Sequence, residues 1–149
     1  MFDRSFVIAK LAAESQSHPT LTARLPVAAD AVARAIRFSR RFAEAEGLDA
    51  ATIDRLVIIV EEWAANIVEH GAANPGSLIV LRLRRTGEGV RIAFSDTGVA
   101  FDPRTAEERG PNLERGGGAG IALIRFWSRI SDYRRRRSRN RLVIELDQR

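Results

Sequence analysis

Residues 51–70 have the sequence ATIDRLVIIVEEWAANIVEH, and this stretch predicts the clearest helix of the chain. Asp49 stands just before it and is suited to cap its first turn. The residues that follow, 70–76, combine glycine and proline and end the pattern. Apolar residues recur inside the stretch at the three- and four-residue spacing of one helical face, at Ile53, Leu56, Val60, Trp63 and Ile67.

The segments on either side of this helix predict the rest of the fold. A strand at 20–25 ends at Pro26, and a first helix runs between Asp30 and Gly47. We expect the chain to form an α+β two-layer sandwich, in which helices cover one face of a mixed β-sheet. The later elements are strands at 78–84 and 90–95 around a turn at 87–89, a helix at 121–127, and strands at 130–136 and 141–146 around a turn at 138–140.

The composition limits the class of protein. The chain has 149 residues, 45% hydrophobic and 29% charged, as expected for one globular domain. There is no cysteine, which excludes disulfides and thiolate chemistry, and His18 and His70 are too far apart for a zinc-protease motif. No apolar run is long enough to span a bilayer. These features favour a soluble, cytoplasmic protein without a membrane partner.

The positive charge is concentrated near the C-terminus. The formal net charge is +5, and the run Arg134–Arg137 lies in the predicted last hairpin. Such a run fits a nucleic-acid binder, whose affinity would fall steeply with salt, but it also fits a hairpin with a solvated basic face. Only Tyr133 adjoins the run, so the alternating aromatic and basic residues of a single-strand binding surface are missing. We therefore favour the solvated face.

Three polar segments are candidates for chemistry, and the first lies on the helix of residues 51–70. Glu62, Asn66 and His70 stand four residues apart and form one polar stripe beside the apolar face. A stripe of this kind is common at the edge of a protein core. Its functional interpretation is that the Asn66 oxygen holds a hard divalent cation, while Glu62 orients or deprotonates a nucleophile.

The second and third segments flank a stretch rich in glycine and charge. Residues 96–103, DTGVAFDP, place a carboxylate and a glycine at a strand end, where Asp96 can accept hydrogen bonds from an amine. The same pattern is found in ordinary turns. Residues 116–120, GGGAG, lead into a helix and offer free N–H groups to phosphate oxygens, although a hinge has the same composition. They match neither a Walker A motif nor a Rossmann turn.

The order of the three segments resembles the nucleotide-binding boxes of the histidine-kinase-like ATPase superfamily (GHKL). The short form, and especially the segments DTGVAFDP, GGGAGIALIRFWSRISDY and NRLVIEL, resembles the anti-sigma factor serine/threonine kinases. The resemblance covers residues 21–146. It implies a nucleotide-binding domain at 20–149, after an N-terminal extension at 1–19 that has no counterpart.

The resemblance implies a role for each matched residue. Glu62 would be the general base that accepts a proton from a substrate hydroxyl, and Asn66 would coordinate the Mg²⁺ that bridges the ATP phosphates. Residues 104–117 would form the lid over ATP, in which Arg109 or Arg115 would reach the γ-phosphate. The remaining nucleotide contacts would come from His70, from Asp96 and Gly98 at the adenine, and from Gly118 and Gly120 at the phosphates.

The resemblance also implies partners. The kinase would phosphorylate an anti-anti-sigma protein of the STAS-domain class, sequester a sigma factor in turn, and form a homodimer. A non-catalytic module that binds ATP and holds a partner is the alternative. One departure concerns the last hairpin, where Asn140-Arg141-Leu142 stands in place of a Gly-Thr pair. Adenine contacts from that hairpin are therefore not expected.

Overall fold

The structure is a computed structural model that describes residues 17–70, 76–105 and 119–148. Among these residues, no helix combines the length and the apolar character needed to cross a membrane. The predicted order of strands and helices is confirmed. The elements are β1 (Leu21–Pro26), α2 (Ala31–Ala45), α3 (Ala50–His70), β2 (Leu78–Arg85), β3 (Gly89–Asp96), α4 (Ala119–Trp127), β4 (Arg129–Arg136) and β5 (Arg139–Asp147).

The five strands form one sheet in the order β1-β2-β3-β5-β4. The sequence predicted a mixed sheet. In the structure each neighbouring pair of strands is antiparallel, so the sheet is antiparallel throughout. The chain passes through two helices between β1 and β2 and reverses direction three times, which makes these strands antiparallel. The hairpin of β4 and β5 then inserts β5 between β3 and β4, so that no parallel pair becomes adjacent.

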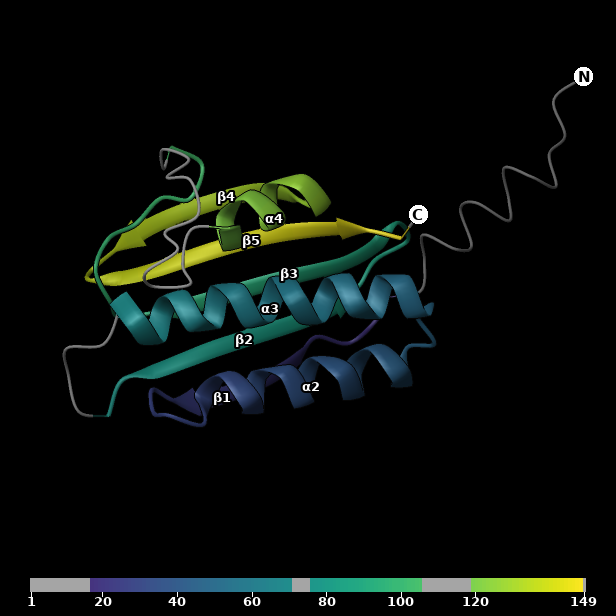
Figure 1. Cartoon of the computed structure of the whole chain (residues 1–149), viewed down its shortest axis with the longest axis horizontal. Coiled ribbons are helices and arrows are strands. Elements are labelled where there is room, and N and C mark those ends of the chain that lie inside the picture. The colour runs from purple at the N-terminus through teal and green to yellow at the C-terminus, as the bar shows by residue number, and fades with distance from the viewer. Residues whose placement is uncertain (1–16, 71–75, 106–118, 149) are drawn as a thin grey trace, which may run out of the picture.

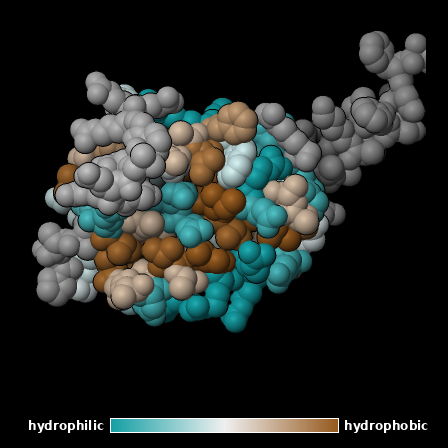
Figure 2. Space-filling model, in the orientation of Figure 1, coloured by the Kyte–Doolittle hydropathy of each residue, from teal (hydrophilic) through white to brown (hydrophobic). Residues whose placement is uncertain are grey.

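The sheet and the helices form two layers, which confirms the predicted α+β sandwich. Figure 1 shows α2 and α3 side by side across one face of the sheet, with α4 beyond α3. The hydrophobic core lies between the layers, where α3 contributes Leu56, Val60 and Trp63. On the helix-covered face, hydrophobic residues gather along the middle of the molecule and hydrophilic residues line the edge beside α2 (Figure 2).

The ends of α3 and of the last hairpin position the site. The backbone N–H of Thr52 donates to Asp49 Oδ1 at 2.9 Å, which confirms the predicted cap of α3. The last turn lies at Arg137 and Ser138, which both have positive φ, and not at residues 138–140. Two residues with positive φ make a tight hairpin turn that matches strand twist, and β5 therefore begins earlier and includes Asn140.

Candidate active site

Asp96 ends β3 with its carboxylate buried at 6% exposure. Its Oδ1 accepts a hydrogen bond from the backbone N–H of Gly98 at 2.8 Å and another from Nδ2 of Asn140 at 3.0 Å. Within the described part of the chain, its Oδ2 receives none. The turn thus fixes a carboxylate that keeps one oxygen available to a ligand donor.

Asn140 is a residue of this polar network that the sequence analysis did not select. It lies opposite Asp96 in the sheet register and is 5% exposed. Besides Asp96, its Nδ2 donates to the carbonyl oxygens of Gly98 at 3.3 Å and Val99 at 3.0 Å. Asn140 therefore links the end of β3 to the loop that follows. A two-residue turn at Arg137 and Ser138 places Asn140 opposite Asp96, so recognising that turn in the sequence would have indicated the contact.

The side-chain oxygen of Asn140 accepts two hydrogen bonds. Its Oδ1 accepts from the hydroxyl of Tyr133 at 3.0 Å and from Nη1 of Arg135 at 2.8 Å. Because acceptors surround the nitrogen and donors surround the oxygen, the network itself fixes the orientation of the amide. Arg135, the inward-facing member of the run Arg134–Arg137, also donates to the Gly98 carbonyl at 2.8 Å.

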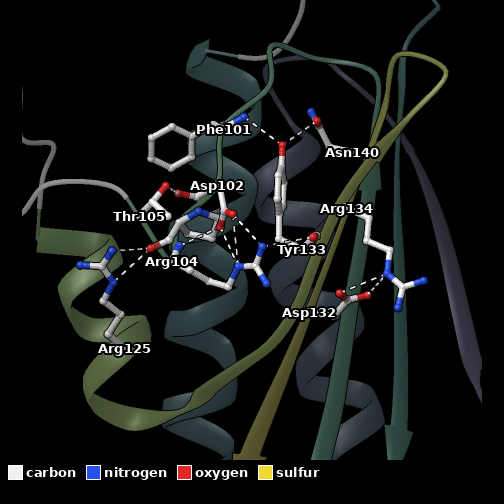
Figure 3. A network of polar contacts seen from close by, with 10 residues as sticks. Phe101, Asp102, Arg104, Thr105, Arg125, Asp132, Tyr133, Arg134 and Asn140 are labelled. Atoms are coloured by element: carbon white, nitrogen blue, oxygen red, sulfur yellow. Dashed lines mark hydrogen bonds and ion pairs between the residues drawn. The ribbon is translucent and has the colours of Figure 1, made fainter.

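The loop after the strand is attached to the hairpin and to α4, as Figure 3 shows. The Tyr133 hydroxyl accepts the N–H of Phe101 at 3.0 Å, and Arg125 of α4 donates to the Pro103 carbonyl. Arg104 forms an ion pair with Asp102 at 2.8 Å. Hydrogen bonds from Arg104 lower the pKa of the Asp102 carboxyl below its ordinary value. This loop therefore keeps a defined course beside α3 and α4.

Glu62 projects from the middle of α3 toward the start of α4. A Cβ added at Gly120 would collide with Oε2 of Glu62 and would lie 3.2 Å from its Cβ. Partial burial, followed by the charge of Glu61, raises the pKa of the Glu62 carboxyl. The carboxylate therefore lies against the first turn of α4, where the helix dipole is positive, and holds its proton more tightly than an exposed glutamate does.

Trp63 and Asn66 follow Glu62 on α3. The Trp63 ring packs on Phe101 with their centroids 6.1 Å apart, which joins α3 to the loop after Asp96. Within the described residues, Nε1 of Trp63 is buried without a hydrogen-bond partner. Asn66 lies one turn after Glu62 and is half-buried. The helix thus presents Glu62 and Asn66 along one line, as their spacing predicted.

One predicted residue, His70, does not join this arrangement. His70 is exposed at the end of α3, where its Nε2 lies 3.7 Å from Oε2 of Glu69. The loop arginines 109 and 115 and the glycine at 118 lie outside the described residues. The structure therefore brings together Glu62, Asn66, Gly120 and, through the Trp63–Phe101 contact, the segment that begins at Asp96.

Among the described residues, few side chains are available to a metal ion. In residues 17–70, 76–105 and 119–148 there is no group of three or more His, Cys, Asp or Glu residues able to hold a metal. Mg²⁺ bound with nucleotide phosphates needs only one or two protein ligands, because phosphate oxygens and water complete its octahedron. A single amide oxygen at Asn66 beside Glu62 fits that requirement.

Comparison with known proteins identifies the family. The model of the histidine kinase-like ATPase domain matches residues 25–146. The chain belongs to this family. No curated protein matches the chain. The resemblance that the sequence motifs indicated is thereby confirmed, and the matched range falls inside the expected domain of residues 20–149.

Solved structures of low identity share the fold. The RsbU and RsbW domains of Rv1364c from Mycobacterium tuberculosis align with a TM-score of 0.61 and 21% identity, over 88% of this chain and 33% of that one. The chain thus spans about a third of the length of that solved chain. The SiaB-SiaC complex from Pseudomonas aeruginosa aligns with a TM-score of 0.57 and 11% identity, over 98% of both chains. A histidine kinase domain from Erythrobacter litoralis aligns with a TM-score of 0.50 and 15% identity, over 93% of this chain and 67% of that one.

Proposed function

We propose that this protein is an ATP-dependent serine/threonine kinase of the anti-sigma factor type. The observation that carries the proposal is the placement of the Glu62 carboxylate against Gly120 at the start of α4. In the proposed site, the Glu62 carboxylate would lie near the phosphates and the Asp96 carboxylate near the base. Membership of the histidine kinase-like ATPase family supports ATP as the nucleotide.

Asp96 is proposed to bind the adenine. An ionised carboxylate only accepts hydrogen bonds, so the available Oδ2 selects a base that offers an amino group. The two donors on Oδ1, from Gly98 and Asn140, hold that oxygen in place before the nucleotide arrives. Such preorganisation reduces the entropy lost on binding. Gly98 is buried beside the carboxylate and is proposed to lie along the ring.

Glu62 is proposed to act as the general base. It accepts the proton of a serine or threonine hydroxyl while the hydroxyl oxygen bonds to the γ-phosphorus, and the bond from that phosphorus to the β–γ bridging oxygen breaks. The products are a phosphoserine or phosphothreonine, ADP and a protonated Glu62. The raised pKa of Glu62 suits this role, because a base with a higher pKa takes the proton more readily.

Asn66 is proposed to hold Mg²⁺ through its side-chain oxygen. When bound, the ion neutralises charge on the transferring phosphoryl group. The first turn of α4, including Gly120, would offer backbone N–H groups to the phosphates, as helix N-termini commonly do. His70, Arg115 and Gly118 are proposed as further nucleotide contacts, with Arg109 as the other candidate for the γ-phosphate.

The proposed protein substrate is an anti-anti-sigma factor of the STAS-domain class, and the proposed second partner is a sigma factor. The likeness in fold to an RsbW domain and to SiaB, which was solved as a complex with SiaC, supports a function exercised on protein partners. We further propose a cytoplasmic homodimer. Partner switching would follow, because phosphorylation changes the charge of the STAS surface that the kinase contacts.

The test is transfer of labelled γ-phosphate from ATP, with Mg²⁺, to a purified STAS-domain protein. We expect label on serine or threonine of that protein and none with the Glu62→Gln variant. Asp54→Asn is the matched control, because Asp54 is an exposed carboxylate on the same helix and the charge change is equal. Transfer that survives Glu62→Gln contradicts the proposed base. ATP binding without transfer favours the partner-holding module.

A further inference from the structure

The face of the sheet that the helices leave uncovered has its own small apolar centre. Strand side chains alternate between faces, so that Ile79 and Leu81 point to the helices and Val80 points away. Val80, Ala93 and Val143 are buried but do not belong to the core cluster between the layers. The register places Ala93 beside Val143, so the centre spans adjacent strands. We call this surface the open face.

The open face is strongly basic around that centre. Its acidic residues among those described are Asp132, Glu145 and Asp147. Glu145 pairs with Arg91 at 3.2 Å, and Asp132 pairs with Arg134 at 3.0 Å and with Arg141 at 3.8 Å. The other arginines that the register assigns to this face have no ion-pair partner in the described part of the chain: Arg24, Arg82, Arg84, Arg129, Arg136 and Arg139.

A pocket of about 270 Å³ hollows one end of the open face. Leu78 and Val80 line it together with Arg24 from β1 and Arg139 from β5. Thr97, the residue between Asp96 and Gly98, also lines it. The pocket thus combines an apolar lining with two guanidinium groups that no described carboxylate neutralises, next to the turn that holds Asp96.

We propose that the open face is the docking site for an acidic segment of a partner protein, which places aspartate or glutamate carboxylates on Arg24 and Arg139. Guanidinium groups bind carboxylates through two parallel hydrogen bonds, and arginine is enriched at protein interfaces for this reason. The apolar centre of Val80, Ala93 and Val143 is already buried, so the surface offered to the segment consists of the arginines around it and the lining of the pocket. This inference does not depend on phosphoryl transfer.

Charge and composition separate this occupant from two others. A second copy of the open face would bring like charges together, which costs energy at an interface. A nucleic acid would be held by its phosphates, but binding of single strands also uses aromatic side chains for stacking. The register points the aromatic residues of the strands, Phe94 and Tyr133, to the helix side. The side chains of the run Arg134–Arg137 point to different faces of the sheet. Arg134 and Arg136 belong to the open face, whereas Arg135 contacts Gly98 and Asn140 at the site.

The experiment measures binding of a fluorescent decaglutamate peptide to the whole protein by anisotropy, at two salt concentrations. The test variant is the double substitution Arg24→Glu with Arg139→Glu. The control is Arg37→Glu with Arg40→Glu, which has the same net charge but changes exposed residues of α2. We expect the test variant to bind at least about tenfold more weakly than the wild type and the control to stay within about twofold.

Three results would overturn the proposal. The first is an equal loss of peptide affinity in both variants, which would mean a response to net charge alone. The second is absence of peptide binding by the wild type. The third is tighter binding of a 20-base-pair DNA duplex than of the peptide. Circular dichroism establishes that each variant is folded. If the glutamate variant does not fold, Arg24→Gln with Arg139→Gln replaces it. Amide NMR shifts caused by the peptide should then be confined to the strands and to Thr97.

Discussion

Replacing Asn140 with alanine should damage both stability and nucleotide binding. The substitution removes the Nδ2 donor from Asp96 at 3.0 Å and from the Val99 carbonyl at 3.0 Å. It also removes the Oδ1 acceptor from Tyr133 at 3.0 Å and from Arg135 at 2.8 Å. Since Asn140 is buried, water does not readily replace these partners.

The expected loss of stability is estimated from the hydrogen bonds that the substitution removes. A net contribution of about 1 kcal/mol for each of the bonds with Asp96, Val99 and Tyr133 gives a loss of about 3 kcal/mol in the free energy of unfolding. The bond to Gly98 is long, at 3.3 Å, and Arg135 is exposed, so these two are counted as contributing little. Asp96 keeps only its bond from Gly98, so its carboxylate is held less firmly. We expect the dissociation constant of ATP to rise at least about tenfold, which corresponds to about 1.4 kcal/mol.

Chemical denaturation and calorimetric titration with ATP measure the two effects. Ser95→Ala is the matched control, because Ser95 is a buried neighbour whose hydroxyl donates only to the Asn140 carbonyl, at 3.1 Å. It should lose about 1 kcal/mol of stability and no ATP affinity. The reasoning is refuted if Asn140→Ala loses less than about 1 kcal/mol, or if its ATP affinity falls no further than that of Ser95→Ala.

Three further predictions concern the helices. Gly120→Ala should lower the rate of phosphoryl transfer at least about tenfold, since its methyl group displaces the Glu62 carboxylate; an unchanged rate would show that this contact is not needed. The raised pKa of Glu62 means that its ionisation costs stability as pH rises through its folded pKa. Glu62→Gln should therefore melt at a higher temperature than the wild type near pH 7 and at the same temperature near pH 3, and a lower melting temperature at pH 7 would contradict the shift. Hydrogen bonds from Thr52 lower the pKa of Asp49, so its stabilisation is present above the ordinary pKa and is lost as pH falls through the folded pKa. Asp49→Ala should accordingly melt below the wild type at pH 7 but together with it in acid, as thermal scans would show.

Much of the fold follows from local patterns in the sequence. The apolar periodicity of α3 and its Asp49 cap predicted a helix that the structure confirms within a residue at each end. The sheet was harder, because strand direction depends on which strands become neighbours. The insertion of β5 between β3 and β4 has no signal in the alternation of either strand.

In the site, too, local spacing in the sequence predicted some features, while others depend on which strands pair. The alignment of Glu62 and Asn66 along α3 could be predicted because helical spacing places them on one line, whereas their proposed roles come from the family resemblance. Asn140 was missed because its role depends on a register across the sheet, and because Arg137 and Ser138 carry the positive φ of a turn usually built from asparagine and glycine. The turn was therefore expected at residues 138–140, which removed Asn140 from the strand. The basic open face was not visible either, since its arginines come from strands far apart in sequence.

Calorimetric titration with ATP, with and without Mg²⁺, tests the central claim most directly. The account predicts saturable binding that weakens when Mg²⁺ is removed and that is lost in the Asp96→Asn variant, whose amide presents a donor to the adenine amino group in place of an acceptor. Absence of ATP binding by a folded sample, or equal binding by Asp96→Asn, would contradict it.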